Sequence, residues 1–133
     1  IMCKASREDP GYFGRTVTVQ EISAVTAACM MIHTEDFWNA GGFDETFQVA
    51  FNDIDLCMKV RAAGKKIVFT PYAELYHYES KSRGLEDTPE KQFRFDKEVK
   101  VFEAKWSEQL AKGDPYYSPN LSVTEGDCSL RVD

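Results

Sequence analysis

The hydrophobic positions of this chain change their spacing along the sequence, and each spacing predicts a different kind of element. Residues 23–33 are almost continuously apolar or β-branched, which is typical of a strand buried on both faces. Residues 52–63 carry acidic side chains at their start and basic ones near their end, and Gly64 follows, as in a helix with favourable ends. Residues 67–69 predict a short strand that ends before Pro71. Together these patterns predict an α/β interior.

Two further helices are predicted from end signals and periodicity. Thr34 can cap a short helix over residues 35–40, and the glycine pair at 41–42 ends it. A longer helix is predicted from Thr88, with Pro89 at its first position, to about residue 110. Apolar side chains recur along it at helical spacing and form one stripe. They are Phe95, Val99, Phe102 and Trp106.

Composition limits the classes of protein and of site that need to be considered. A chain of 133 residues with 43% hydrophobic and 13% aromatic content fits one ordinary globular domain. A net charge of −6 without clustered basic residues argues against a nucleic-acid partner. No apolar run approaches the ~20 residues of a membrane span, so we expect a cytoplasmic protein that contacts a membrane only peripherally, at its inner face, if at all.

The four cysteines lack the clustered spacing of a zinc site. Cys29 and Cys57 lie in apolar stretches, where a reduced thiol packs as a small hydrophobic group. We therefore expect buried free thiols, which suit a reducing cytosol, and the alternative of two disulfides stays open.

The chain divides into three stretches by composition. Residues 1–22 form a polar lead-in with turn signals, 23–112 carry the predicted strands and helices, and 113–133 form a turn-rich, extended C-terminal tail. The sequence begins at Ile1 without an initiator methionine, so we expect a segment of a longer protein.

Five short motifs, in a fixed order, resemble the second half of family 2 glycosyltransferases. The motifs occupy 41–47 (GGFDETF), 51–57 (FNDIDLC), 71–77 (PYAELYH), 79–84 (ESKSRG) and 114–122 (DPYYSPNLS). Each motif is weakly specific alone, and their order along the chain makes the resemblance specific. It is strongest to bacterial rhamnosyl- and O-antigen-type transferases.

The resemblance implies the acceptor-side portion of a GT-A fold, with part of a mixed sheet flanked by helices. It implies an inverting enzyme that moves a sugar from a nucleoside-diphosphate sugar to a glycan acceptor in cell-surface polysaccharide synthesis. The half of the family's domain that binds the nucleotide is not in this sequence, so we expect the isolated segment to be inactive. An unpaired strand edge would also favour a homodimer of the segment.

Asp53 matches the position of the catalytic base in the family, at the start of the predicted helix over 52–63. A carboxylate there has a fixed backbone and can face a bound acceptor. The alternative is that Asp53 only caps the helix. Asp55 completes the letters of a metal-binding DxD motif, but the two side chains diverge by about 200° on a helix. We therefore interpret Asp55 as structural, or as the partner of a nearby arginine.

His77 matches the histidine that completes the Mn²⁺ or Mg²⁺ shell in many members of the family. A lone histidine is also a common structural group, and that alternative stays open. Arg83 follows on a polar loop and matches the family's diphosphate-binding segment. Its alternative is a solvated surface arginine.

The family's acceptor-side wall matches a short aromatic and glycine-rich stretch. The residues expected to bind the acceptor are Trp38, Gly41, Gly42 and Asp44. Trp38 has an alternative place in the core. Two other functions stay open for the whole chain: a non-catalytic glycan- or partner-binding module, and a structural oligomerisation domain.

Overall fold

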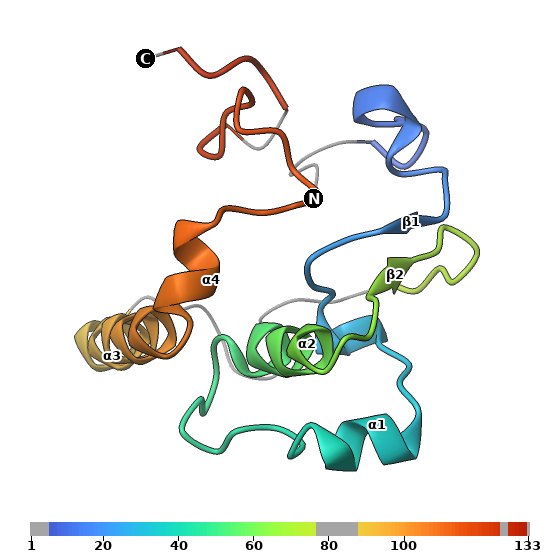
Figure 1. Cartoon of the computed structure of the whole chain (residues 1–133). Coiled ribbons are helices and arrows are strands. Elements are labelled where there is room, and N and C mark those ends of the chain that lie inside the picture. Colours follow the sequence, from blue (N-terminus) through green and yellow to red (C-terminus); the bar gives the residue numbers. More distant parts are fainter. Residues whose placement is uncertain (1–5, 77–87, 126–127, 133) are drawn as a thin grey trace.

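The computed structural model describes residues 6–76, 88–125 and 128–132 (Figure 1). Helix α2 lies at the centre, with α3 and α4 on one side, the strand pair on the other and α1 below it. The elements in chain order are η1 (Tyr12–Gly14), β1 (Gln20–Glu21), η2 (Ala27–Cys29), α1 (Thr34–Asn39), α2 (Asn52–Ala62), β2 (Val68–Phe69), α3 (Pro89–Lys105) and α4 (Ser107–Ala111).

The described strands form one antiparallel pair. Gln20 of β1 lies opposite Phe69 of β2, and Glu21 lies opposite Val68. The Ile22 amide continues the pairing by donating to the Ile67 carbonyl at 3.0 Å. Helices with this small sheet are compatible with the predicted α/β class, and the strand predicted at 67–69 is confirmed. The mixed sheet stays a prediction.

The strand predicted over residues 23–33 is wrong. Its middle forms the 3₁₀ helix η2, whose N-cap residue Thr26 accepts a hydrogen bond from the Ala28 amide at 3.3 Å. Met31 is 99% exposed, so the run is not buried on both faces. A central strand needs partners on both edges, and no described strand pairs with this segment. Local hydrogen bonds therefore determine the backbone conformation of this segment.

This correction also changes the expected environment of the cysteines. Cys29 lies in η2 and is exposed, contrary to the predicted burial, whereas Cys57 in α2 is buried as predicted. Both thiols are free. Burial raises the pKa of the Cys57 thiol, as expected for a thiol that packs as a hydrophobic group.

Helix α2 is confirmed, with a different cap from the one predicted. Asn52 is the first helical residue, and the N-cap is Phe51, whose φ of 65° lies in the left-handed region. The Asn52 side chain instead accepts a hydrogen bond from the Asp53 amide at 2.7 Å. At the other end, Gly64 has φ 80° and stops the helix, as its position predicted.

The long helix begins as predicted but is interrupted before residue 110. The Thr88 hydroxyl accepts from the Lys91 amide at 3.4 Å, and Pro89 is the first helical residue of α3. The interruption falls at Trp106, which has φ −112° and separates α3 from α4. The indole of this buried residue donates to Asp55 across the core, and the break that periodicity did not predict falls at this residue.

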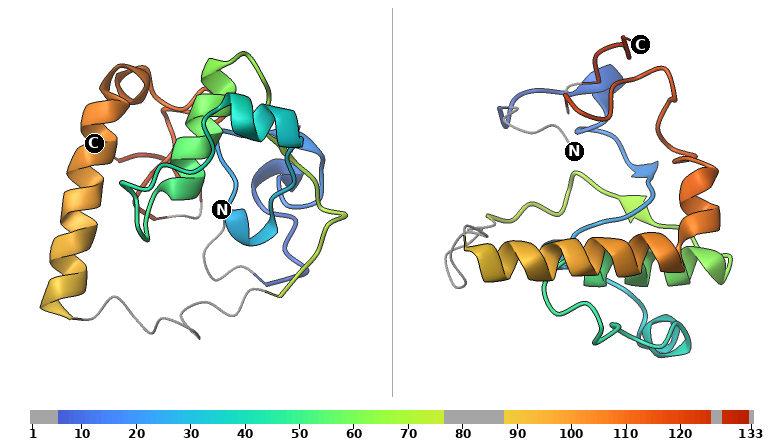
Figure 2. Two further views of the ribbon diagram at one scale, coloured as in Figure 1. Left: turned by 90° about the horizontal axis from the view of Figure 1, so that it is seen from below. Right: turned by 90° about the vertical axis from the view of Figure 1, so that its left-hand side faces the viewer.

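The largest buried cluster lies between the C-terminal half of α3 and α2 with the loop before it, and the two helices run side by side (Figure 2). Its buried members are Phe47, Phe102 and Trp106, with Phe51, Met58 and Val101 packed against them. The Phe51 ring stacks on the Phe102 ring, with centroids 4.9 Å apart. The C-terminal half of the predicted apolar stripe is thus confirmed as core. No helix in the described part of the chain is both long and apolar enough to cross a membrane.

Candidate active site

Asp53 lies in the first turn of α2 with its carboxylate held by two backbone amides. The Oδ2 atom accepts from the Ala27 amide at 3.1 Å, and Oδ1 accepts from the Ile54 amide at 2.8 Å. The side chain remains half-buried, so it is not sealed from solvent. One of these bonds reaches η2, 26 residues earlier in the chain. Asp53 is therefore fixed in position and partly accessible, which both a base and a capping residue require.

The glycine pair before α2 forms the turn that its sequence predicted. Gly41 and Gly42 have φ values of 81° and 62°, a region that costs other residues strain. Gly42 is also buried, and a Cβ there would lie 3.3 Å from the Phe37 ring. Trp38 is 68% exposed and meets Phe37 edge to face. Trp38 is thus a surface aromatic, and the alternative that placed it in the core is wrong.

Asp55 is completely buried at the centre of an ionic network. Its Oδ1 accepts from Trp106 Nε1 at 2.9 Å and lies 2.7 Å from Lys105 Nζ. Its Oδ2 lies 3.1 Å from Lys59 Nζ. A buried carboxylate is tolerated only with such partners. The structural interpretation of Asp55 is confirmed, with two lysines in place of the expected arginine.

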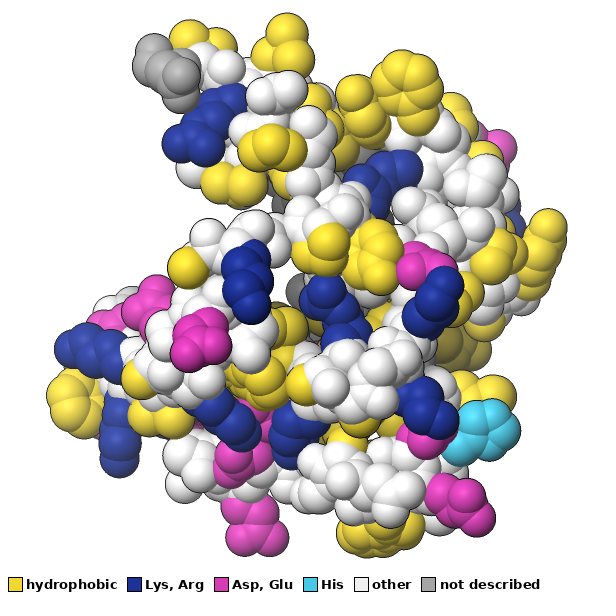
Figure 3. Space-filling model, viewed as in Figure 1, with side chains coloured by type: hydrophobic (Ala, Val, Ile, Leu, Met, Phe, Trp, Pro, Cys, Tyr) yellow, Lys and Arg dark blue, Asp and Glu magenta, His cyan; other side chains and the backbone are white. Residues whose placement is uncertain are grey.

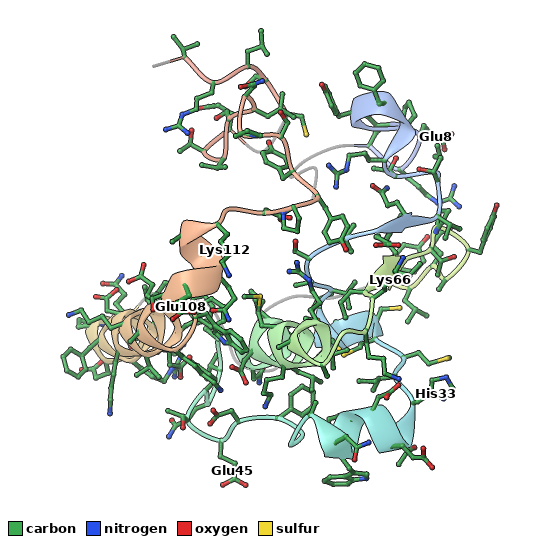
Figure 4. The ribbon with its side chains drawn as sticks, viewed as in Figure 1. Glu8, His33, Glu45, Lys66, Glu108 and Lys112 are labelled. Carbon is green, nitrogen blue, oxygen red and sulfur yellow. The ribbon has the colours of Figure 1, made fainter. Side chains whose placement is uncertain are left out.

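The same two lysines extend the network to the glycine-rich loop. Lys59 donates to the Gly42 carbonyl at 2.6 Å, and Lys105 donates to Asp44 Oδ2 at 2.8 Å. The network therefore joins the loop over 42–44 to α2 and to the end of α3. Glu45, the next residue, points away from the protein (Figure 4). The described hydrogen bonds connect Gly42 and Asp44 to this network and not to Asp53.

The ion pair of Asp44 predicts a pH dependence of stability. Lys105, aided by the Thr46 amide, holds the pKa of the Asp44 carboxyl well below its ordinary value. A lowered pKa in the folded state stabilises the protein above the unfolded pKa, about 4, and this contribution is lost as the pH falls. Asp44→Asn should therefore cost more stability at pH 6 than at pH 3, measured by urea unfolding at both values. A cost that is equal at the two values would contradict this account.

Glu98 is a buried acidic residue of α3 that the sequence analysis did not select. It is 4% exposed, and its carboxylate accepts from the backbone amides of Gln48 and Ala50. The available signal was its place on the apolar stripe, four residues before Phe102. A carboxylate in a buried stripe requires partners, and these lie 48 to 50 residues away in sequence.

The motif at 114–122 packs against the lead-in and, through the Tyr116 ring under Arg61, against the end of α2. Arg15 donates to the Tyr116 carbonyl at 3.0 Å, and the Tyr116 hydroxyl donates to Glu21 at 3.0 Å. A cavity of about 530 Å³ lies there between the lead-in and the tail. A second cavity of about 370 Å³ lies between α2, α4 and the tail, where the surface is hollowed (Figure 3). Ile54, which follows Asp53, lines both cavities.

Two predicted site residues, His77 and Arg83, lie outside the described residues. Within the described ranges, no three histidine, cysteine or acidic side chains gather as a metal site would require. His33 is described and lies at the N-cap of α1, where it is exposed (Figure 4). The described residues therefore do not by themselves supply a Mn²⁺ or Mg²⁺ site.

Comparison with known proteins finds similar sequences, among them the following three. The uncharacterized protein y4gI of Sinorhizobium fredii is 53% identical over 124 residues, which cover 92% of this chain and 14% of that protein. The O-antigen biosynthesis protein RfbC of Myxococcus xanthus is 38% identical over 126 residues, or 90% of this chain and 9% of that protein. N-acetylglucosaminyl-diphospho-decaprenol L-rhamnosyltransferase of Mycobacterium tuberculosis is 32% identical over 60 residues, or 45% of this chain and 20% of that protein.

The chain thus spans less than a fifth of the length of the two relatives that it matches almost throughout. No family model matches the chain, and no solved structure matches it. The similarity to each of these two relatives covers about nine tenths of the chain. It is therefore not confined to the short motifs and includes the helices between them.

Proposed function

We propose that this chain is the acceptor-side part of an inverting family 2 glycosyltransferase with a GT-A fold. The enzyme would transfer a sugar from a nucleoside-diphosphate sugar to a glycan acceptor in the synthesis of a surface polysaccharide. The names of two relatives support this reaction class, one an O-antigen biosynthesis protein and the other a rhamnosyltransferase. The ordered motifs at 41–47, 51–57 and 114–122 support the family.

The observation that carries the proposal is the position and accessibility of the Asp53 carboxylate. It is partly accessible, and two backbone amides fix it at the start of α2. A general base must be held within hydrogen-bond reach of the proton that it removes. Each oxygen accepts one described hydrogen bond, and a carboxylate has about four acceptor sites in total. The carboxylate therefore retains acceptor capacity for a hydroxyl.

In the proposed reaction, Asp53 takes the proton of the acceptor hydroxyl as that oxygen forms a bond to the anomeric carbon of the donor sugar. The bond from the anomeric carbon to the diphosphate oxygen breaks, and its electron pair leaves with the nucleoside diphosphate. Attack opposite the leaving group inverts the anomeric configuration. Arg83 is the residue that we propose for holding the diphosphate, because a guanidinium binds phosphate oxygens in pairs.

A divalent metal ion is part of the same proposal, with His77 as its ligand from this chain. When bound, Mn²⁺ or Mg²⁺ would stabilise the negative charge of the leaving diphosphate. The exposed Trp38 and the turn at 41–42 are the proposed acceptor-side surface. Asp44 would act there through the loop that its ion pair with Lys105 holds.

The reaction class is tested by donor turnover in the natural full-length protein. The protein would be incubated with UDP- and dTDP-sugars and Mn²⁺ or Mg²⁺, and the released nucleoside diphosphate measured, with a matched sample in EDTA. We expect release from at least one donor in the metal-containing samples. Binding of donors or glycans without any release would contradict catalysis and favour a non-catalytic binding module.

A further inference from the structure

Glu98 is a buried charge for which the proposed reaction has no direct use. Its side chain is 4% exposed on α3, yet it holds two backbone amides of a loop that is distant in sequence. Oε1 accepts from the Gln48 amide at 3.2 Å, and Oε2 accepts from the Ala50 amide at 2.7 Å. Arg94, one helical turn earlier, places its Nε 3.9 Å from Oε1. Burying a carboxylate is unfavourable without such compensation, so these contacts determine the conformation of the loop.

The loop that Glu98 holds leads into α2 through a conformation that requires support. Phe51, directly after Ala50, has φ 65° and is not a glycine. A left-handed conformation at such a residue persists only where its surroundings enforce it. The Phe51 ring stacks on Phe102 of α3, and the Phe51 carbonyl accepts from the Asp55 amide at 2.7 Å. Helix α3 therefore holds the amide before this turn and the side chain within it.

Asp53 follows this turn by two residues, so the turn determines the direction in which the first residues of α2 project. The Oδ2 atom of the Asp53 carboxylate accepts a hydrogen bond from the Ala27 amide of η2. A chain of contacts thus runs from Glu98 through Ala50 and Phe51 to Asp53, and from there to Ala27. Each link is either a hydrogen bond or a step of one or two residues along the backbone.

We propose that Glu98 is a positioning residue for Asp53. Its carboxylate holds the amides at 48 and 50, fixes the left-handed turn at Phe51 and so places the Asp53 carboxylate against Ala27. The catalytic consequence rests on the proposed function, because it requires Asp53 to be the base. The structural coupling from Glu98 to Ala27 does not depend on that function and can be measured separately.

Two substitutions at this position separate charge from size. Glu98→Gln keeps the volume but replaces one acceptor oxygen by an amide donor, which faces another donor at Gln48 or Ala50. Glu98→Asp keeps both acceptor oxygens on a shorter side chain. Glu103→Gln, on an exposed position of the same helix, is the matched control.

The structural part is tested by backbone hydrogen exchange in the natural full-length protein and its variants. In Glu98→Gln we expect faster exchange of peptides that contain Gln48 and Ala50, and also of the peptide that contains Ala27. Exchange of the peptide that contains β2 should not change, which excludes general unfolding. Glu98→Asp should restore part of the protection, and it carries the same test if Glu98→Gln does not fold. Faster exchange at 48–50 with unchanged exchange at Ala27 would overturn the proposal.

The catalytic part is tested by the kinetics of donor turnover. A displaced base should lower kcat by roughly 10- to 100-fold while KM for the donor stays nearly unchanged, since misplacement of a reacting group by about 1 Å has effects of that size. Glu98→Asp should recover part of kcat. A change in KM alone would overturn the positioning role. If the exchange coupling is observed and Asp53→Asn is fully active, the coupling stands and the proposed function fails.

Discussion

Replacement of Asp55 by alanine should lower the free energy of unfolding by about 3 kcal/mol, because it removes the centre of the buried network. Trp106 Nε1 would lose its acceptor, and the ammonium groups of Lys59 and Lys105 would lose their shared carboxylate. Breaking a buried ion pair typically costs about 3–5 kcal/mol. We expect the lower end of this range because the two lysine side chains are 19% and 33% exposed and can be partly solvated.

Urea unfolding followed by tryptophan fluorescence measures this loss, since the indole of Trp106 is itself part of the network. Asp55→Asn should be destabilised less than Asp55→Ala, because its amide oxygen can still accept from that indole. Asp96→Ala, at an exposed position of α3, is the control and should change stability by less than about 0.5 kcal/mol. Equal stabilities of Asp55→Ala and Asp96→Ala would show that the network contributes little.

Two helix ends were predicted correctly because their signals are local. Thr88 and Pro89 mark the start of α3, and Gly64 marks the end of α2, through interactions within a few residues. The predicted caps Thr34 and Asn52 were wrong, since each is the first helical residue and the N-caps are His33 and Phe51. The strand predicted at 23–33 failed because its identity depends on neighbouring strands, which apolar composition cannot supply. In their absence from the described residues, a local hydrogen bond to Thr26 and a tertiary one to Asp53 favour the turn at η2.

The sequence predicted which residues belong to the candidate site better than it predicted the residues that they contact. Sequence position alone placed Asp53 at the start of a helix and separated it from Asp55, and the structure agrees on both points. The partners of these residues, Ala27 and Lys105, lie 26 and 50 residues away and could not be inferred without the fold. Glu98 was missed for the same reason, since its contacts are tertiary. In the sequence it belongs to no motif and is marked only by its place on one face of the helix.

Replacement of Asp53 by asparagine should lower donor turnover by roughly 10²- to 10⁴-fold, the usual contribution of a general base. Asparagine is nearly the same size and has a neutral oxygen that can still accept a hydrogen bond from the Ala27 or Ile54 amide. The fold should therefore persist, with a loss of about 1 kcal/mol or less for the weakened capping contacts. The variant thus separates a loss of chemistry from a loss of structure.

The central claim is tested most directly by steady-state turnover of one nucleoside-diphosphate sugar in the natural full-length protein. The samples are wild type, Asp53→Asn and the control Asp96→Asn. Donor affinity and urea stability of the same samples complete the comparison. We predict that only Asp53→Asn loses turnover, by at least about 100-fold, while it binds the donor and unfolds nearly as wild type does. Wild-type turnover by Asp53→Asn would contradict the claim and leave Asp53 as a residue that only caps α2 and η2.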